Sequence, residues 1–229
     1  MSQLTNASML EERFWEYFKY KGLAPQPGYI DIDTQWRELL PKTVGAAGRL
    51  LINELSSATT VLDVGAGDRY YADVLKKLGL SAKYSSVDLD TTYGSHDYRE
   101  FLQVQDKFDA ILMFELIEHL SLNDGIEFMA HARQLLRPNC PLIISTPNAH
   151  HPNQVWRSEL THIRPWPANS LYAILRLVGF DSVKLVRQYF LSGRKRRLIA
   201  PLTKALYRIL ELDHAQTTIA IARWSPHAA

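Results

Sequence analysis

The chain has 229 residues, hydrophobic residues at 46% of its positions and a formal net charge of +2, which indicates a globular protein with ample material for a core. The near-balance of charge gives no overall field favouring nucleic acid. Its single cysteine, Cys140, excludes an internal disulfide, and no stretch of about 18 uncharged apolar residues predicts a membrane span. No apolar signal-peptide core precedes Glu11, so we expect a cytoplasmic protein, with contact at a membrane surface as the alternative.

The first 57 residues predict an N-terminal helical cap. A helix is expected over 8–21, where aromatic side chains crowd most faces, followed by a loop over 22–33 that holds prolines and glycines. Further helices are expected over 34–40 and 44–55. The cap therefore leads directly into a second region.

Residues 58–229 predict a main domain in which strands and helices alternate. The expected strands are 60–65, 83–88, 93–96, 109–114, 141–145, 181–190 and 217–223, and the expected helices are 70–78, 123–136 and 168–178. Such alternation is typical of a parallel sheet covered on both faces. We expect an α/β fold, a Rossmann-like, doubly wound, seven-stranded and mostly parallel sheet with helices on both faces and an antiparallel edge strand.

A glycine turn follows the first of these strands. Residues 61–67 read VLDVGAG, and Asp88 ends the next short apolar run 21 residues after Gly67. A strand, a glycine turn that opens a helix and an acid about 20 residues later form a nucleoside-binding pattern. Position 70 is Tyr70, where a dinucleotide-binding G-x-G-x-x-G motif would have a third glycine. The pattern therefore favours a nucleoside without a pyrophosphate, of which S-adenosylmethionine is the commonest.

The chain resembles the class I S-adenosylmethionine-dependent methyltransferases, and within them the branch of the ubiquinone-biosynthesis O-methyltransferases. The resemblance runs from about Thr59 to Gly179 and rests on motifs in a fixed order: VLDVGAG at 61–67, Asp88, FDAIL at 108–112, FELIEHL at 114–120, LRP at 136–138, STPN at 145–148 and LVGF at 177–180. One departure is Asp68, which occupies a position that is usually small in the family. Its carboxylate could cap the following helix or meet the ammonium group of the cofactor.

The resemblance implies roles for residues at the carboxyl ends of the strands, where ligands of such sheets bind. It assigns Asp63 and the turn residues Gly65, Ala66 and Gly67 to the methionine end of S-adenosylmethionine. Asp88 would take the ribose hydroxyls, with Leu89 beside it. Asp97 would meet the adenine amino group or be a plain loop residue, and Phe114 would also line the cofactor site.

Acidic residues and a histidine follow the strand at 109–114. The resemblance implies that Glu115, Glu118 and His119 could hold Mg²⁺ or Mn²⁺, because similar E-x-x-E-H sequences bind a divalent ion in ubiquinone-pathway enzymes and in small-RNA 2′-O-methyltransferases. His162 is a candidate fourth group. The alternatives are that His119 acts as a general base without metal, together with Glu115 and His162 as catalytic residues, or that these residues only cap a helix.

An insertion at about 191–213 precedes the last strand. It begins with four basic residues, Arg194 to Arg197, and continues to Leu210 with apolar residues at spacings of three and four. This pattern predicts an amphipathic helix, which could contact an anionic membrane, a partner subunit or its own domain. Membrane contact through 194–210 would suit a lipid-linked acceptor.

The function expected from these features is transfer of a methyl group from S-adenosylmethionine to a hydroxyl of a small or lipid-linked metabolite. Two alternatives remain open: a non-catalytic nucleoside-binding partner module, and an RNA 2′-O-methyltransferase. The acceptor, the atom methylated, the need for metal and the oligomeric state do not follow from the sequence.

Overall fold

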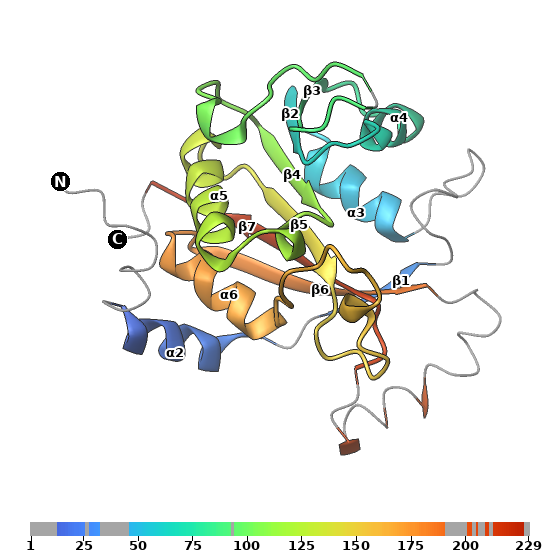
Figure 1. The fold of residues 1–229 in the computed structure, drawn as a ribbon, viewed down its shortest axis with the longest axis vertical. Coiled ribbons are helices and arrows are strands. Elements are labelled where there is room, and N and C mark those ends of the chain that lie inside the picture. Colours follow the sequence, from blue (N-terminus) through green and yellow to red (C-terminus); the bar gives the residue numbers. More distant parts are fainter. Residues whose placement is uncertain are drawn as a thin grey trace.

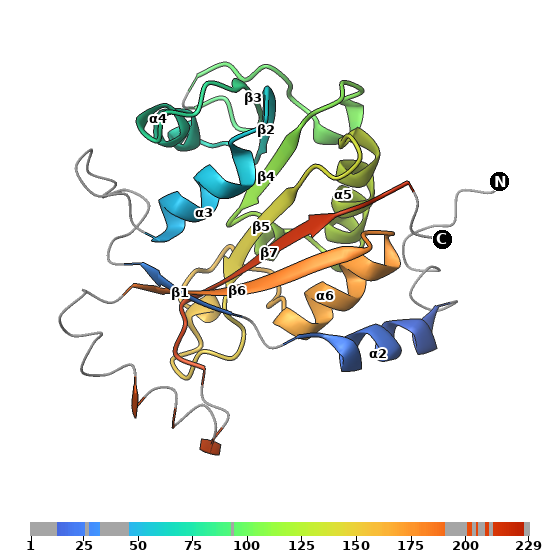
Figure 2. The same ribbon diagram turned by 180° about the vertical axis from the view of Figure 1, so that it is seen from behind.

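A computed structural model describes residues 13–25, 28–32, 46–92, 94–190, 201–202, 205, 209–210 and 213–226. Their centre is a seven-stranded sheet with the order β1-β6-β7-β5-β4-β2-β3 (Figures 1 and 2). The strands are β1 (Gly28–Ile32), β2 (Thr60–Val64), β3 (Lys83–Val87), β4 (Ala110–Phe114), β5 (Leu142–Pro147), β6 (Ser182–Phe190) and β7 (Thr217–Arg223). The predicted doubly wound α/β fold is confirmed.

Helices cover both faces of this sheet. The helices are α2 (Phe14–Leu23), α3 (Ala46–Leu55), α4 (Tyr70–Lys77), α5 (Leu122–Leu135) and α6 (Ala168–Leu177), with short 3₁₀ turns η2 (Phe101–Gln103), η3 (Ile117–His119) and η4 (Val155–Arg157). One apolar core joins the sheet to α5 and α6, and a second joins its other face to α3 and α4. Alternate residues of β2, β4, β5, β6 and β7 enter the two cores, as expected when a sheet is buried on both sides.

The position of the antiparallel strand differs from the prediction. β7 runs antiparallel to both of its neighbours, β5 and β6, and therefore lies inside the sheet and not at its edge. The edge is formed by β1, which pairs in parallel with β6 over Gly28–Ile32. The prediction of a loop over 22–33 is wrong for these five residues, because the prolines at 25 and 27 only precede the strand.

Six of the seven predicted strands are present, and the one predicted at 93–96 is not. Gly94 has a φ of +123°, which is incompatible with a regular strand, and the segment returns to the sheet only in a single bridge between Val87 and Tyr98. The seventh strand is therefore β1. The predicted helix over 34–40 and the basic run 194–197 lie outside the described residues.

The first described helix, α2, packs against α6. Tyr17 Oη donates a 3.0 Å hydrogen bond to Ser170 Oγ, and Arg13 donates to the carbonyl oxygen of Leu177 at 2.7 Å. Among the described residues, no helix is long and apolar enough to cross a membrane. The N-terminal region thus contacts the rest of the fold in two places: α2 packs against α6, and β1 pairs with β6 as the edge strand of the sheet.

Candidate functional site

The glycine turn after β2 lies against the end of β3. The backbone N–H groups of Gly65 and Ala66 both donate to the carbonyl oxygen of Val87, at 2.9 and 3.1 Å. Gly65 has a φ of +73°, and a Cβ there would lie 2.8 Å from Leu116 Cδ1. Gly67 has a φ of +50° with open space around it. Both the backbone conformation and the contact with Leu116 therefore require glycine at position 65.

Asp88 follows β3 and holds the same turn from the other side. Its Oδ2 accepts a 2.7 Å hydrogen bond from the backbone N–H of Gly67, and its Oδ1 accepts one from Asp90 at 2.9 Å. The neighbouring side chain of Leu89 is 69% exposed. A half-buried carboxylate beside a bare apolar side chain suits a ribose and the flat base attached to it.

Asp63 lies in β2, and its side chain is 1% exposed. Tyr84 Oη, from the adjacent strand β3, donates a 2.6 Å hydrogen bond to Asp63 Oδ2. Burial, with a smaller contribution from the charges of Asp88 and Asp68, raises the pKa of Asp63 to about 7, while the Tyr84 hydrogen bond acts to lower it. Sequence reasoning selected Asp63 but missed Tyr84, which is brought to it by the pairing of two strands.

The side chain of Asp68 has a local partner. Its Oδ1 accepts a 3.0 Å hydrogen bond from the backbone N–H of Tyr70, the first residue of α4. This bond lies one residue before the N-cap, Arg69, whose own side chain makes no capping bond, and it favours the interpretation in which Asp68 orders the start of α4. The next residue, Arg69, adopts the left-handed conformation with a φ of +60°.

Asp97 anchors the loop beyond β3. Its Oδ2 accepts hydrogen bonds from the backbone N–H and the hydroxyl of Ser86, at 2.9 and 3.1 Å, and Arg69 lies 3.8 Å away. Partial burial acts to raise the pKa of Asp97, but the Ser86 bonds and the charge of Arg69 together lower it. The carboxylate is therefore ionised at neutral pH and remains open to solvent on its other side.

An aromatic residue, Phe114, ends β4, and Glu115, which has a strained backbone conformation, follows it. The ring of Phe114 packs 4.4 Å from that of Tyr71 in α4, measured between centroids. Glu115 follows with a φ of +48°, an unfavourable conformation for a residue with a side chain. Its carboxylate accepts a 2.7 Å hydrogen bond from Ser145 Oγ, and the surrounding protein raises its pKa by limiting hydration of the charged form.

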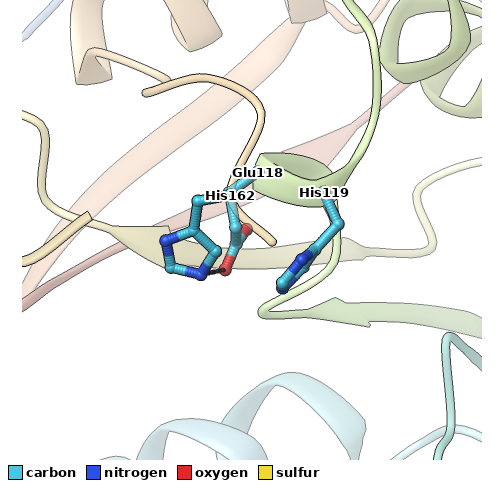
Figure 3. Close-up of side chains that lie close together, drawn as sticks. All are labelled: Glu118, His119 and His162. Carbon is cyan, nitrogen blue, oxygen red and sulfur yellow. Dashed lines mark ion pairs between the residues drawn. The ribbon is translucent and has the colours of Figure 1, made fainter. Parts of the chain in front are cut away.

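Glu118, His119 and His162 form a compact cluster beyond β4 (Figure 3). One ligand atom from each lies within 4.8 Å of the others. Glu118 is fully buried, and among the described residues neither of its carboxylate oxygens has a partner in hydrogen-bond geometry, although Thr146 and Glu115 lie close enough to affect its pKa. His162 Nε2 lies 4.0 Å from Oε1. Burial, and next the charge of Glu115, raise the pKa of Glu118 to about 8. Glu115, which the sequence placed in the metal set, is not one of these three residues.

Both histidine rings are oriented by backbone carbonyl groups. His162 Nδ1 lies 2.6 Å from the carbonyl oxygen of Trp156, and His119 Nδ1 lies 3.2 Å from that of Thr161. Because a carbonyl oxygen only accepts, each Nδ1 must carry the proton, which leaves a lone pair on each Nε2 of the neutral rings. Desolvation lowers the pKa of His119, so its ring is neutral at pH 7.

The segment that carries His162 is tied to η3 by further bonds. The backbone N–H of Ile163 donates to the carbonyl oxygen of Glu118 at 2.8 Å, and Trp166 Nε1 donates to that of Ile117 at 2.7 Å. The Trp166 ring is buried against Gly125 of α5, where a Cβ would lie 2.6 Å from the ring. This anchoring explains how residues more than 40 positions apart in the chain form one cluster.

Comparison with known proteins decides the family. A family described as a methyltransferase domain matches residues 32–185, which is more than half of the chain. The chain belongs to this methyltransferase family. The resemblance to S-adenosylmethionine-dependent methyltransferases is therefore confirmed, and the chain is an enzyme of this class. A search of curated proteins found no match.

Solved structures share the fold. An S-adenosylmethionine-dependent methyltransferase from Archaeoglobus fulgidus is 20% identical, with 78% of this chain and 91% of that chain covered and a TM-score of 0.62. A 1,6-didemethyltoxoflavin-N1-methyltransferase from Burkholderia thailandensis, with bound 1,6-didemethyltoxoflavin and S-adenosylhomocysteine, is 18% identical over 96% of this chain and 88% of that chain, with a TM-score of 0.52. The [4+2]-cyclase SpnF is 12% identical over 95% and 96%, with a TM-score of 0.56. At these identities the likeness shows the fold alone.

Proposed function

We propose that this methyltransferase transfers the methyl group of S-adenosylmethionine to a hydroxyl group of a small molecule. The observation that carries the proposal is the cluster of Glu118, His119 and His162 just beyond β4, which supplies an oriented base on the side of the sheet where ligands of this fold bind. In the reaction, the acceptor oxygen bonds to the methyl carbon while the sulfur–carbon bond breaks. The hydroxyl proton passes to the base, and S-adenosylhomocysteine remains.

The proposed cofactor site follows the ends of β2, β3 and β4. The turn of Gly65, Ala66 and Gly67 would lie against the methionine end, close to the buried charge of Asp63. The ribose hydroxyls would bind Asp88, and the adenine ring would lie on Leu89 with its amino group near Asp97. Phe114 would close the apolar side. Support comes from the partial exposure of Asp88, the exposure of Asp97 and the exposure of Leu89.

His119 is the proposed proton acceptor. Its Nε2 holds a lone pair because Nδ1 is engaged with Thr161, and its lowered pKa keeps that lone pair available at neutral pH. His162 packs against it with the two ring centroids 4.7 Å apart. Glu115 directly follows Phe114 in the chain. We propose that His162 and Glu115 orient His119 and the acceptor hydroxyl.

A divalent ion held by this cluster is the alternative we propose to a metal-free base, because the single lone pair of His119 Nε2 can bind a metal or accept a proton, but not both. The donors fit Mg²⁺ or Mn²⁺. Glu118 has two buried oxygens without a hydrogen-bond partner in the part of the chain that the structure describes. The Nε2 atoms of His119 and His162 carry lone pairs, because Nδ1 of each ring is bound to a backbone carbonyl oxygen. Glu115 would join only by leaving Ser145. When bound, such an ion would lower the pKa of the acceptor hydroxyl.

The acceptor class has support of two kinds. The 1,6-didemethyltoxoflavin-N1-methyltransferase was solved with 1,6-didemethyltoxoflavin and S-adenosylhomocysteine bound, which favours a small molecule here; its name gives methylation at N1, so it does not support the hydroxyl. Leu202, Ile209 and Leu210 are exposed, in keeping with the amphipathic pattern predicted for the insertion. Contact with a membrane and a lipid-linked acceptor remain predictions.

The test is a methyl-transfer assay with S-adenosylmethionine and a panel of small phenols and alcohols, with matched amines and a short RNA in parallel. Each reaction is run with Mn²⁺ and with chelator, and product is measured by mass. We expect methylation of a hydroxyl compound that falls at least about a hundredfold in H119A. Methylation of amines or RNA alone would contradict the proposed acceptor.

A further inference from the structure

The contact between Asp63 and Tyr84 has no role in the proposed chemistry, although it lies beneath the proposed cofactor site. In the parallel pairing of β2 with β3, Tyr84 lies opposite Val61, two residues before Asp63 on the same face of the sheet. The diagonal placement lets the phenol reach forward to the carboxylate, with a donor–acceptor distance of 2.6 Å. Asp63 stands two residues before Gly65, in the strand that leads into the turn.

The surroundings of Asp63 raise the free energy of its ionised form. The side chain is almost fully buried, and the acids Asp88 and Asp68 lie near enough to repel its charge. The neighbouring cation, Arg69, contacts other groups: its guanidinium lies 5.7 Å from the centroid of the Tyr84 ring and 3.8 Å from Asp97. Among the described residues, the one hydrogen bond given to the Asp63 carboxylate is that of Tyr84.

Tyr84 can donate a hydrogen bond to Asp63 at every neutral pH because its phenol does not ionise in that range. Burial foremost, and then the negative charge of Asp63, raise the pKa of Tyr84, so the phenol stays a donor throughout the neutral range. A phenylalanine would fill the same space without donating. Asp63 would then lose the hydrogen bond that offsets its burial.

We propose that Tyr84 is a positioning residue for the cofactor, which fixes Asp63 and keeps it ionised so that its charge attracts the ammonium group at the amino-acid end of S-adenosylmethionine. The inference rests on the proposed placement of that end at the glycine turn. Asp63 acts through its field and not by contact, because it is covered by the protein. Binding of the cofactor then depends on the protonation of a residue in the strand below it.

The test compares two ligands that differ at the amino-acid end. S-adenosylhomocysteine carries the ammonium group, and 5′-methylthioadenosine lacks the amino-acid portion. Dissociation constants are measured by calorimetry from about pH 5.5 to about pH 8.5 for the wild type, Y84F, D63N and Y172F, which removes a phenol from α6 on the other face of the sheet.

For the wild type we expect the affinity for S-adenosylhomocysteine to fall by up to about tenfold per pH unit below the midpoint, with little change for methylthioadenosine. In Y84F the midpoint should move up by about one pH unit, giving roughly fivefold weaker binding at pH 7 that recovers near pH 8.5. D63N should bind more weakly with no such pH dependence, and Y172F should match the wild type.

A Y84F loss that is equal at every pH would indicate a structural role and overturn the inference. The same holds if both ligands share one pH dependence. In either case binding of S-adenosylhomocysteine would leave the proposed function intact. If the wild type binds neither ligand, the proposed cofactor site itself fails, and the inference fails with it.

Discussion

The backbone N–H of Gly67 donates a 2.7 Å hydrogen bond to Oδ2 of Asp88, joining the glycine turn to the acid that follows the next strand. The contact orients the Asp88 carboxylate without a ligand present. One of its oxygens is held by the turn and the other by the backbone of Asp90. A ribose would therefore meet a carboxylate that is already fixed, which reduces the entropy lost on binding.

Replacing Asp88 should abolish most of the affinity for the cofactor. D88A removes a charged acceptor for two ribose hydroxyls, and hydrogen bonds to charged groups contribute about 1.5–3 kcal/mol each, so we expect at least about a hundredfold weaker binding of S-adenosylhomocysteine. D90A is the matched control, because the side chain of Asp90 is exposed and, among the described residues, is hydrogen-bonded within its own turn to Thr92. Calorimetry measures both. Equal affinities in the two variants would remove Asp88 from the site.

The glycine turn gives a second prediction, about stability. G65A combines a φ of +73° with a Cβ 2.8 Å from Leu116, and we expect a loss of about 2–4 kcal/mol in the free energy of unfolding. Gly79 provides the control, since its φ is +75° with open space around it. G79A should cost only the strain, about 1–2 kcal/mol. Chemical denaturation measures the difference, and equal losses would show that the Leu116 contact does not matter.

The packing of Trp166 on α5 should hold the segment of His162 in place. In G125A the new methyl group would lie 2.6 Å from the Trp166 ring, so we expect a loss of about 1–3 kcal/mol and a fall in methyl transfer. G22A in α2 meets no neighbouring atom and should be neutral or stabilising by up to about 1 kcal/mol. Thermal unfolding and the methyl-transfer assay are run side by side. Full activity in G125A would mean that the position of Trp166 is not needed.

Burial of Glu118 predicts a dependence of stability on pH. Its pKa is raised from 4.5 to about 8, so the folded protein holds this proton more tightly than the unfolded chain does. The free energy of unfolding should therefore fall as the pH rises from about 4.5 to about 8, and the full penalty applies above that range. In chelator, E118Q should lose the part of this fall that comes from Glu118, while the parts from Asp63 and Glu115 remain, and it should be more stable than the wild type at about pH 9.

The same variant tests the proposed divalent ion. Mn²⁺ should raise the melting temperature of the wild type, increasingly so at higher pH, because a cation offsets the buried charge. E118Q should show no such increase. If Mn²⁺ leaves the wild type unchanged across this range, the cluster is not a metal site, and His119 alone remains as the proposed base.

The candidate site residues that could be predicted from the sequence lie at the ends of predicted strands. Asp88 and Phe114 end apolar runs, and parallel strands bring such ends to one edge of the sheet, so their grouping could be predicted. His162 was a weaker candidate, since its place beside His119 depends on the path of a long loop. That path is set by the bonds of Ile163 and Trp166 to η3.

What the sequence could not predict depends on pairing across the sheet. Tyr84 reaches Asp63 only because β3 pairs with β2 in a particular register. β1 was missed because its pairing with β6 joins segments more than 150 residues apart, and nearby prolines favour a loop. The antiparallel strand was placed at the edge because the sequence does not show that β7 pairs on both sides, with β5 and with β6.

The most direct test of the whole account is a calorimetric titration of the purified wild-type protein with S-adenosylhomocysteine, once with Mn²⁺ and once with chelator. The account predicts one site per chain with micromolar affinity in both conditions, because the glycine turn, Asp88 and Asp97 are in place without metal. Absence of binding in both conditions would contradict the proposed cofactor site. The alternative of a non-catalytic module with the same fold would then be favoured.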